Sequence, residues 1–160
     1  MTTLIGTNRA KPKVYLIGAI SGCTFEEAME WRFEVRDRME HMFQVLVPCE
    51  MTPQSMGGHD RYTYTLDGVS GHMTDRLVTA KDRYLVKNSD LVIANFSYDA
   101  NRVSLASMIE LGWADAWEKP ILMVIKEDSL HYHSFTKSLN NCIHVADMES
   151  AIEVMEHFQF

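Results

Sequence analysis

Continuous apolar runs, in place of alternating polar and apolar residues, set the strongest constraint on the fold of this chain. The candidate strands cover residues 13–18, 44–47, 91–96, 121–125 and 142–145. Runs of this kind are typical of parallel strands that are covered on both faces. Helical patterns lie between several of them, which gives right-handed strand–helix–strand units. The sequence therefore predicts an α/β fold, a doubly wound (Rossmann- or flavodoxin-like) five-stranded parallel sheet with helices on both faces.

Helix signals occupy several segments between the expected strands. Thr24 has the side chain of an N-cap, and Glu27 would complete a capping box for a helix that runs to about His41. Further helices are expected through residues 77–88, from Ser104 and from Asp147. Doubly wound folds bind ligands at the carboxyl ends of the strands, where the strand order changes direction. Residues that follow the strands are therefore candidates for a site.

Length and charge limit the kinds of partner. The chain has 160 residues, enough for one core. We expect a flexible N-terminal tail over residues 1–12 and a single domain over residues 13–160. The net charge of −7 and the scattered basic residues argue against a nucleic-acid polymer as partner. A small phosphorylated ligand remains open, since one pocket needs only a few donors.

The cysteines and histidines have no spacing typical of a disulfide framework or a metal site. Cys23, Cys49 and Cys142 are far apart and odd in number, which indicates reduced thiols and a cytoplasmic location. The histidines form no recognisable zinc pattern, so no metal is expected. No stretch approaches the roughly 18 apolar residues of a membrane span, and no membrane contact is expected.

Glu110 is the first candidate for chemistry. It lies in the expected helix after the run 91–96. The face of this helix that packs on the sheet is predicted from the apolar positions 105, 108, 109, 112, 113 and 116. A carboxylate between such positions is poorly solvated, so Glu110 is either a reactive group or a buried structural acceptor. Ser104 either caps the helix or binds a phosphate, with Arg102 as a charged donor nearby.

Two other segments allow both a functional and a structural interpretation. The turn from Gly18 to Thr24 is either a phosphate cradle or an ordinary turn of the fold. Asp82 is either an acid or base-recognition group or, as the pattern alone favours, a solvated carboxylate beside Lys81 and Arg83. The glycine-rich segment from Glu50 to about Met73 is predicted to be a lid, with a disordered insertion as the alternative.

Taken together, these segments resemble the nucleoside 2-deoxyribosyltransferase-like family. Val14-Tyr15-Leu16-Ile17-Gly18 is similar to the V-Y-L-x-G strand with which members begin. Asp82 matches an Asp in the helix before the third strand. Glu110-Leu111-Gly112-Trp113-Ala114 matches the E-[LI]-G-x-A signature of the following helix. The similarity covers roughly residues 14–125, in the family's order.

The resemblance implies a role for each matching residue. Glu110 would be the nucleophile that attacks C1′ of the sugar, and Asp82 would contact the base and help to protonate it. A position near a helix N-terminus would favour the ionised form of Glu110 against desolvation. The implied partner is a small nucleotide or nucleoside, with no cofactor, bound by a homodimer or larger assembly. The substrate-binding candidates are Tyr15, Gly18, Ile20, Ser21, Gly22, Arg102, Ser104, Ser107 and Tyr62.

Ser104 indicates the branch of the family. Transferases commonly place an Asp six residues before the nucleophile, whereas nucleoside 5′-monophosphate N-glycosidases place a phosphate-binding Ser there, as this chain does. The resemblance is therefore nearest to the N-glycosidases. A deoxyribosyltransferase is the first alternative, and a non-catalytic nucleotide-binding module is the second. In the hydrolases a Ser from a neighbouring subunit completes the phosphate site, a role open to Ser134 or Ser138.

This chain departs from the N-glycosidase pattern at two positions. Ala106 occupies a position that is usually Gly, and Ser21 stands where one hydrolase type has Arg. Arg102, Arg32 and His133 are candidates to supply the missing phosphate affinity. The sequence indicates neither the base nor the choice between ribose and deoxyribose.

Overall fold

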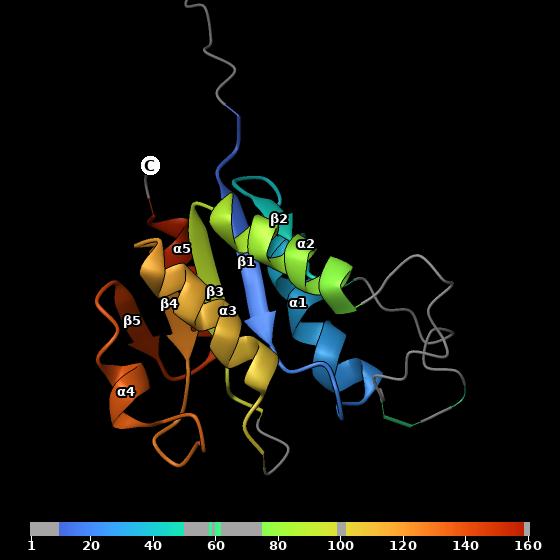
Figure 1. Ribbon diagram of the computed structural model, residues 1–160. Helices are drawn as coiled ribbons and strands as arrows, with labels where there is room; N and C mark the ends of the chain where they lie inside the picture. Colours follow the sequence, from blue (N-terminus) through green and yellow to red (C-terminus); the bar gives the residue numbers. More distant parts are fainter. Residues whose placement is uncertain (1–9, 50–57, 59, 62–74, 99–101, 159–160) are drawn as a thin grey trace, which may run out of the picture.

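The computed structural model describes residues 10–49, 58, 60–61, 75–98 and 102–158. Its strands form one five-stranded parallel sheet in the order β2-β1-β3-β4-β5 (Figure 1). The strands are β1 Lys13–Gly18, β2 Gln44–Leu46, β3 Leu91–Asn95, β4 Ile121–Val124 and β5 Cys142–Val145. The predicted fold class is confirmed, and each predicted strand lies within one residue of its observed bounds. Most of the predicted tail over residues 1–12 is outside the described residues.

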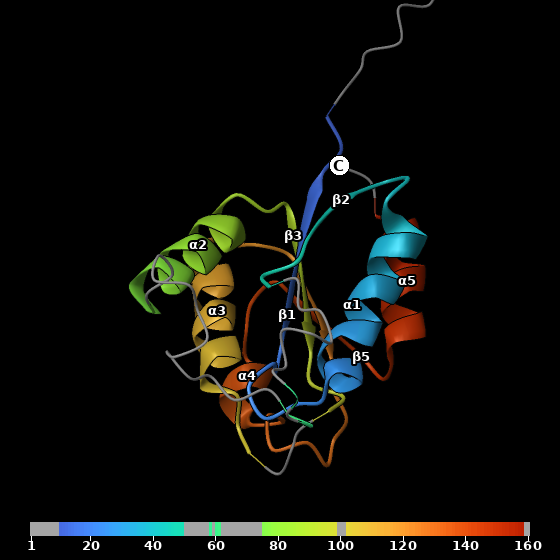
Figure 2. The same ribbon diagram turned by 90° about the vertical axis from the view of Figure 1, so that its right-hand side faces the viewer.

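The central strand explains the longest apolar run. β3 pairs with β1 on one side and with β4 on the other, and all five of its residues are buried. Helices cover both faces of the sheet (Figure 2). A strand that has neighbours at both edges and helices on both faces offers no side to water, so a continuous apolar sequence is what it requires.

The helices form two layers, one on each face of the sheet (Figure 2). α1 Phe25–Met39 and α5 Met148–Glu156 cover one face, and α2 Asp75–Lys87 and α3 Leu105–Ala116 cover the other. A short helix, α4 Ser134–Lys137, lies between β4 and β5. None of the helices among the described residues has the length and apolar character needed to cross a bilayer.

Side chains alternate along β1 between the two core layers. Val14 and Leu16 pack in the core on the α1 and α5 side. Tyr15 and Ile17 pack in the core on the α2 and α3 side, together with Leu111. This period of two in a strand directs Tyr15 toward α3, the helix that carries Glu110.

The start of α1 follows the prediction. Thr24 is its N-cap, and the Glu27 N–H donates to Thr24 Oγ1 at 3.2 Å. The Thr24 N–H donates in turn to Glu27 Oε2 at 2.8 Å, which completes the predicted capping box. The capping box fixes where the turn after β1 ends and α1 begins.

The predicted sheet-facing side of α3 is wrong. Leu105 is 76% exposed and Ile109 is 54% exposed, and both were expected to pack on the sheet. The buried residues of α3 are Ser107, Glu110, Leu111 and Ala114. Of the six predicted positions, Met108 and Trp113 pack partly against the core. In its first two turns the inner side of this helix carries Ser107 and Glu110, because it borders a cavity there.

Candidate active site

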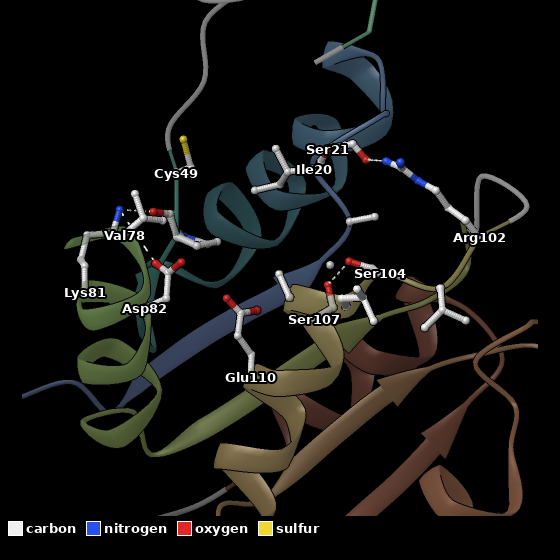
Figure 3. A pocket seen from close by; sticks show the side chains of 16 residues that line it. Ile20, Ser21, Cys49, Val78, Lys81, Asp82, Arg102, Ser104, Ser107 and Glu110 are labelled. Carbon is white, nitrogen blue, oxygen red and sulfur yellow. Dashed lines mark hydrogen bonds and ion pairs between the residues drawn. The ribbon is translucent and has the colours of Figure 1, made fainter. Parts of the chain in front are cut away.

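A cavity of about 430 Å³ opens at the carboxyl ends of β1 and β3, where the strand order changes direction (Figure 3). The turn after β1, the residues after β2, helix α2 and the start of α3 contribute its walls. The lining residues are Gly18, Ala19, Ile20, Ser21, Pro48, Cys49, Val78, Lys81, Asp82, Arg102, Val103, Ser104, Leu105, Ala106, Ser107 and Glu110. The structure therefore brings together the separate sequence motifs that carry the candidate residues.

Glu110 lies in the cavity wall between two groups of polar side chains (Figure 3). Its side chain is buried, and the residue is 8% exposed. The Tyr15 hydroxyl donates a hydrogen bond to Glu110 Oε1 at 3.1 Å. Burial and the nearby Glu110 charge raise the pKa of Tyr15, so the phenol keeps its proton and acts as a donor. Tyr15 thus orients one oxygen of Glu110 without lining the cavity itself.

Burial has the largest effect on the ionisation of Glu110. It raises the pKa of this carboxyl to about 7, and repulsion from Asp82 contributes in the same direction. The Tyr15 hydrogen bond and the Arg32 charge lower the pKa but do not cancel the effect of burial. The expected help from the helix N-terminus is therefore outweighed. A carboxyl with a pKa of about 7 is present in both its ionised and its protonated form near neutral pH, and shifted pKa values of this kind are typical of active-site groups.

Asp82 faces the same cavity from α2 (Figure 3). Its side chain is 15% exposed, so the solvated carboxylate favoured by the sequence pattern is wrong. Oδ1 is buried and has no hydrogen-bond partner among the described atoms, and Lys81 Nζ lies 4.0 Å from it. Burial raises the pKa of Asp82 to about 6. A protonated Asp82 would have a proton to donate to a ligand in the cavity.

The other end of the cavity carries hydrogen-bond donors and a positive charge. The Arg102 guanidinium donates to the Ser21 carbonyl oxygen, and both residues line the cavity (Figure 3). Ser104 is the N-cap residue of α3, but in the described structure its side chain makes no capping hydrogen bond. Its hydroxyl lies 2.9 Å from the Ser107 hydroxyl. The first turn of α3 therefore presents hydroxyl groups and uncapped N–H groups to the cavity.

Of the three candidates for additional phosphate contacts, one lines the cavity and two do not. Arg102 lines the cavity. Arg32 is fully buried and does not line it; its guanidinium donates to the carbonyl oxygens of Ala28 and, at 2.8 Å, Gly18. His133 is exposed and caps α4 by accepting from the Phe135 N–H. Arg32 thus supports the turn after β1 through its hydrogen bond to the Gly18 carbonyl oxygen. Of the three residues, only Arg102 borders the cavity.

The remaining predicted site residues have different positions. Gly18, Ile20 and Ser21 line the cavity. A Cβ on Gly18 would lie 2.8 Å from the Trp31 ring, so this position requires a glycine. Gly22 has a φ of +80° and does not line the cavity; its carbonyl oxygen accepts from Arg61 at 2.8 Å. A positive φ of this size is unfavourable for residues with a side chain, so the backbone at position 22 favours glycine.

Three further predictions concern residues beyond this cavity or beyond the described part of the chain. Tyr62 lies outside the described residues, as does most of the predicted lid over residues 50–73. Ser134 begins α4 and Ser138 directly follows it; both are exposed and neither lines the cavity of its own chain. A contribution from either serine to a second subunit stays a prediction.

Sequence reasoning did not identify several residues of the site. Pro48 and Cys49 follow β2 and line the cavity beside Val78 and Lys81 of α2. The rule that ligands meet the carboxyl ends of parallel strands would have identified residues 48–49, because they directly follow the second predicted strand. His131, which contacts Ser104, had no signal in the sequence pattern. Among the described residues, no group of three or more His, Cys, Asp or Glu side chains could hold a metal ion.

A model of the nucleoside 2-deoxyribosyltransferase family matches residues 14–151. The chain belongs to this family. The match spans both candidate carboxylates and all five strands except Lys13, which agrees with the resemblance carried by the short motifs. Among curated protein sequences, none is significantly similar to this chain.

Solved structures similar to this one include proteins that are named for different roles. A CMP N-glycosidase from Clostridium botulinum, BcmB, is 18% identical, with a TM-score of 0.57 over 91% of this chain and 99% of that one. A 2-deoxyribosyltransferase from Leishmania mexicana is 14% identical, with a TM-score of 0.58 over 93% and 99%. A Moco carrier protein from Chlamydomonas reinhardtii is 17% identical, with a TM-score of 0.58 over 92% and 96%. At these identities the comparisons establish the fold.

Proposed function

We propose that this family member is a (deoxy)nucleoside 5′-monophosphate N-glycosidase, which releases a free base and a sugar 5-phosphate. The observation that supports this most directly is the distribution of the polar groups along the cavity. Two carboxyl groups with raised pKa values, Glu110 and Asp82, line one part of it. Arg102 and the hydroxyls of Ser104 and Ser107 line the other part.

This arrangement suits the three parts of a nucleotide. The phosphate would bind at Arg102, Ser104 and the N–H groups of the first turn of α3, where an anion is favoured. The base would lie against Val78 and Asp82. The sugar would then lie over Glu110, between the two ends (Figure 3).

The proposed reaction has two steps at C1′. The ionised Glu110 carboxylate attacks C1′ while the bond from C1′ to the base nitrogen breaks, and the bonding electron pair leaves with the base. The base takes the proton of Asp82. Water then attacks C1′ of the glycosyl ester, its proton returns to Asp82, and the Glu110 carboxylate is released with the sugar 5-phosphate. Tyr15 holds Glu110 in place through the 3.1 Å hydrogen bond.

Two other functions have support of their own. A deoxyribosyltransferase, favoured by the family match, would share the glycosyl ester on Glu110 and pass the sugar to a second base in place of water. A non-catalytic carrier is the other candidate, because the Moco carrier protein has a similar fold. Since fold alone does not decide function, this similarity does not distinguish a carrier from an enzyme. The raised pKa of both cavity carboxyls favours an enzyme over a carrier.

A single screen tests the proposal. The protein is incubated with the common nucleoside 5′-monophosphates, in ribo and deoxy forms, and in parallel with the matching nucleosides. Each reaction is run once with a second free base and once without it. The products are separated by chromatography. We expect release of a free base from at least one monophosphate and little from its nucleoside. A new nucleoside formed only with the second base would identify a transferase. Tight binding of a nucleotide without any product would overturn the enzymatic proposal.

Replacing Ser104 with Asp should weaken the preference for the phosphorylated substrate. The new carboxylate would repel the phosphate at the start of α3, so the KM for the monophosphate should rise by about tenfold or more, which corresponds to about 1.4 kcal/mol. The KM for the unphosphorylated nucleoside should change little. Ser104→Ala is the matched control, since it removes the hydroxyl without adding charge. Equal effects of the Asp variant on both substrates would contradict a phosphate at this end.

We also infer that two copies associate through the outer side of α3 (Figure 1). Ile109 is 54% exposed there, and Leu105, which also lines the cavity, is 76% exposed. A Cβ on Gly112 would meet no described atom within 4 Å, so packing within the chain does not require a glycine. Glycine inside a helix costs about 1 kcal/mol relative to alanine, which is understandable if another helix approaches closely at this point.

Replacing Ile109 with Glu should therefore reduce the assembly to a monomer. The charge would be buried in the contact between two copies, and light scattering after size-exclusion chromatography would show the halved mass. Ile143→Glu is the matched control, because Ile143 is 51% exposed on β5. A wild-type protein that is monomeric at micromolar concentration, or an Ile109 variant that remains a dimer, would contradict this interface.

A further inference from the structure

His131 is a buried histidine that contacts the start of α3. It follows β4 in the chain and is 3% exposed. The Ser104 N–H donates to His131 Nε2 at 3.1 Å. The imidazole stacks on the Phe96 ring, with 4.3 Å between the ring centroids and 20° between the planes. Phe96 directly follows β3, so the histidine side chain is anchored at the same edge of the sheet as the cavity.

The hydrogen bonds around His131 define which ring nitrogen carries the proton. Because Nε2 accepts from a backbone N–H, it has no proton of its own, and a neutral ring then has its proton on Nδ1. Nδ1 faces the Ser129 hydroxyl at 3.5 Å. The backbone of His131 is held as well, since its N–H donates to Ser129 Oγ at 3.2 Å and its carbonyl accepts from Thr136 Oγ1 at 2.6 Å. Contacts of both the ring and the backbone of His131 therefore hold Nε2 in place as the acceptor for the Ser104 N–H.

The contact has a direct consequence for the cavity. Ser104 lines the cavity and its side chain makes no capping hydrogen bond in the described structure, so the side chain does not itself hold the helix end in place. The backbone bond to His131 does so instead. With the Ser104 N–H occupied, the groups left at this end for an anion are Arg102, the Ser104 and Ser107 hydroxyls and the N–H groups of the first turn of α3.

We propose that His131 is a positioning residue for the phosphate end of the cavity, acting through the backbone of Ser104. This inference rests on the proposed function for the identity of the ligand, and on the described contacts for the geometry. His131 does not line the cavity and is not expected to touch the substrate. Its role is to hold the Ser104 hydroxyl and the start of α3 at the place where the phosphate binds.

A pair of substitutions separates this role from general packing. In His131→Gln the side-chain amide oxygen can occupy the place of Nε2, whereas in His131→Asn the shorter side chain reaches only the place of Nδ1. We expect the Asn variant to raise the KM for the preferred 5′-monophosphate by about tenfold, as for the loss of one positioned hydrogen bond, with little change in kcat. The KM for the matching nucleoside should not change. The Gln variant should recover most of the affinity for the monophosphate.

A measurement that needs no turnover accompanies the kinetics. The ¹H–¹⁵N NMR signal of Ser104 reports its hydrogen bond to His131, and titration with inorganic phosphate should shift the amide signals of residues 104–107. The Asn variant should move the Ser104 signal in the absence of phosphate and weaken the phosphate response, and the Gln variant should restore both. Thermal unfolding of the two variants shows whether each is folded.

The outcomes distinguish this inference from the proposed function. If the wild-type protein releases no base from any monophosphate, the proposed function fails, and the phosphate titration still decides the role of His131. If base is released but the Asn and Gln variants match the wild type in KM and in the phosphate response, the positioning role is overturned. Equal losses for monophosphate and nucleoside, or equal losses in both folded variants, would also overturn it, because a purely structural histidine predicts that result.

Discussion

Replacing Glu110 with Gln should lower base release from the preferred nucleoside 5′-monophosphate by at least about 10³-fold, the scale expected when a nucleophile is removed. Gln keeps the shape of the side chain, and its amide oxygen can still accept from Tyr15, whose hydroxyl lies 3.1 Å from the present carboxylate. Nucleotide affinity, measured by calorimetry, should therefore be retained. A variant that keeps more than a tenth of the activity would exclude Glu110 as the nucleophile.

The same substitution should stabilise the protein at alkaline pH. Burial raises the pKa of Glu110 from 4.5 to about 7, so the folded state binds this proton more tightly than the unfolded state does. Stability is therefore lost as the pH rises from about 4.5 through 7, by on the order of 3 kcal/mol for this group. The Gln variant avoids this cost, so it should unfold at a higher temperature than the wild type at pH 8.

The stability gain should shrink as the pH falls below 7 and should vanish below pH 4.5, where Glu110 becomes protonated in the unfolded state as well. Thermal unfolding from pH 4.5 to 8 measures this. Glu118→Gln is the matched control, because Glu118 is an exposed residue just beyond α3 and should change neither the activity nor the pH dependence. A Glu110 variant that is less stable than the wild type at pH 8 would indicate that the carboxylate is a structural acceptor.

Replacing Asp82 with Asn should lower base release by about 10²-fold or more, as expected for the loss of a general acid. The loss should be smaller for a nucleotide analogue whose base leaves readily without a proton. Asp128→Asn, in an exposed turn after β4, removes the same charge away from the cavity and serves as the control. A loss that does not depend on the leaving group would contradict the role of Asp82 as the acid.

The pH profile of kcat/KM provides a second test of Asp82. The wild-type profile should be bell-shaped and should have its maximum between about 6 and 7, because the reaction needs the pair of carboxyls to hold a single proton and the two pKa values are about 6 and about 7. The reactive form, with Glu110 ionised and Asp82 protonated, is the minor of the two singly protonated forms, since Glu110 has the higher pKa, and it follows the same bell-shaped dependence on pH. The Asn variant should lose the alkaline limb and show a single rise. The negative charge of Asp82 raises the pKa of Glu110, so this rise should have an apparent pKa below 7.

Local chemistry of the sequence was sufficient for much of the fold. The apolar run 91–96 predicted a central parallel strand because a strand covered on all sides has no place for polar alternation. Thr24 and Glu27 predicted the start of α1 because a capping box depends on residues three positions apart. Such features involve neighbours in the chain, so they can be read without knowing the rest of the molecule.

The same reasoning failed for α3 because helix periodicity does not indicate which side faces inward. The apolar positions, among them Leu105 and Ile109, suggested one side, whereas Ser107 and Glu110 occupy the inner side next to the cavity. A helix that borders a ligand cavity on one side and an exposed surface on the other need not place its apolar residues inward. The pattern for Asp82 failed for a related reason, since burial by α3 and the cavity walls cannot be inferred from Lys81 and Arg83.

The sequence by itself determined the order of the five strands and of helices α1, α2, α3 and α5, the family motifs and the identity of the two carboxyl groups, because these depend on residue types at short spacing. Only the tertiary structure decided that Asp82 and Glu110 share one cavity, that Tyr15 orients Glu110 and that His131 holds Ser104. Those contacts join residues 95 and 27 positions apart for Tyr15 and His131. The distance between such residues, and the loss of water that raises both pKa values, arise only when the helices close over the sheet.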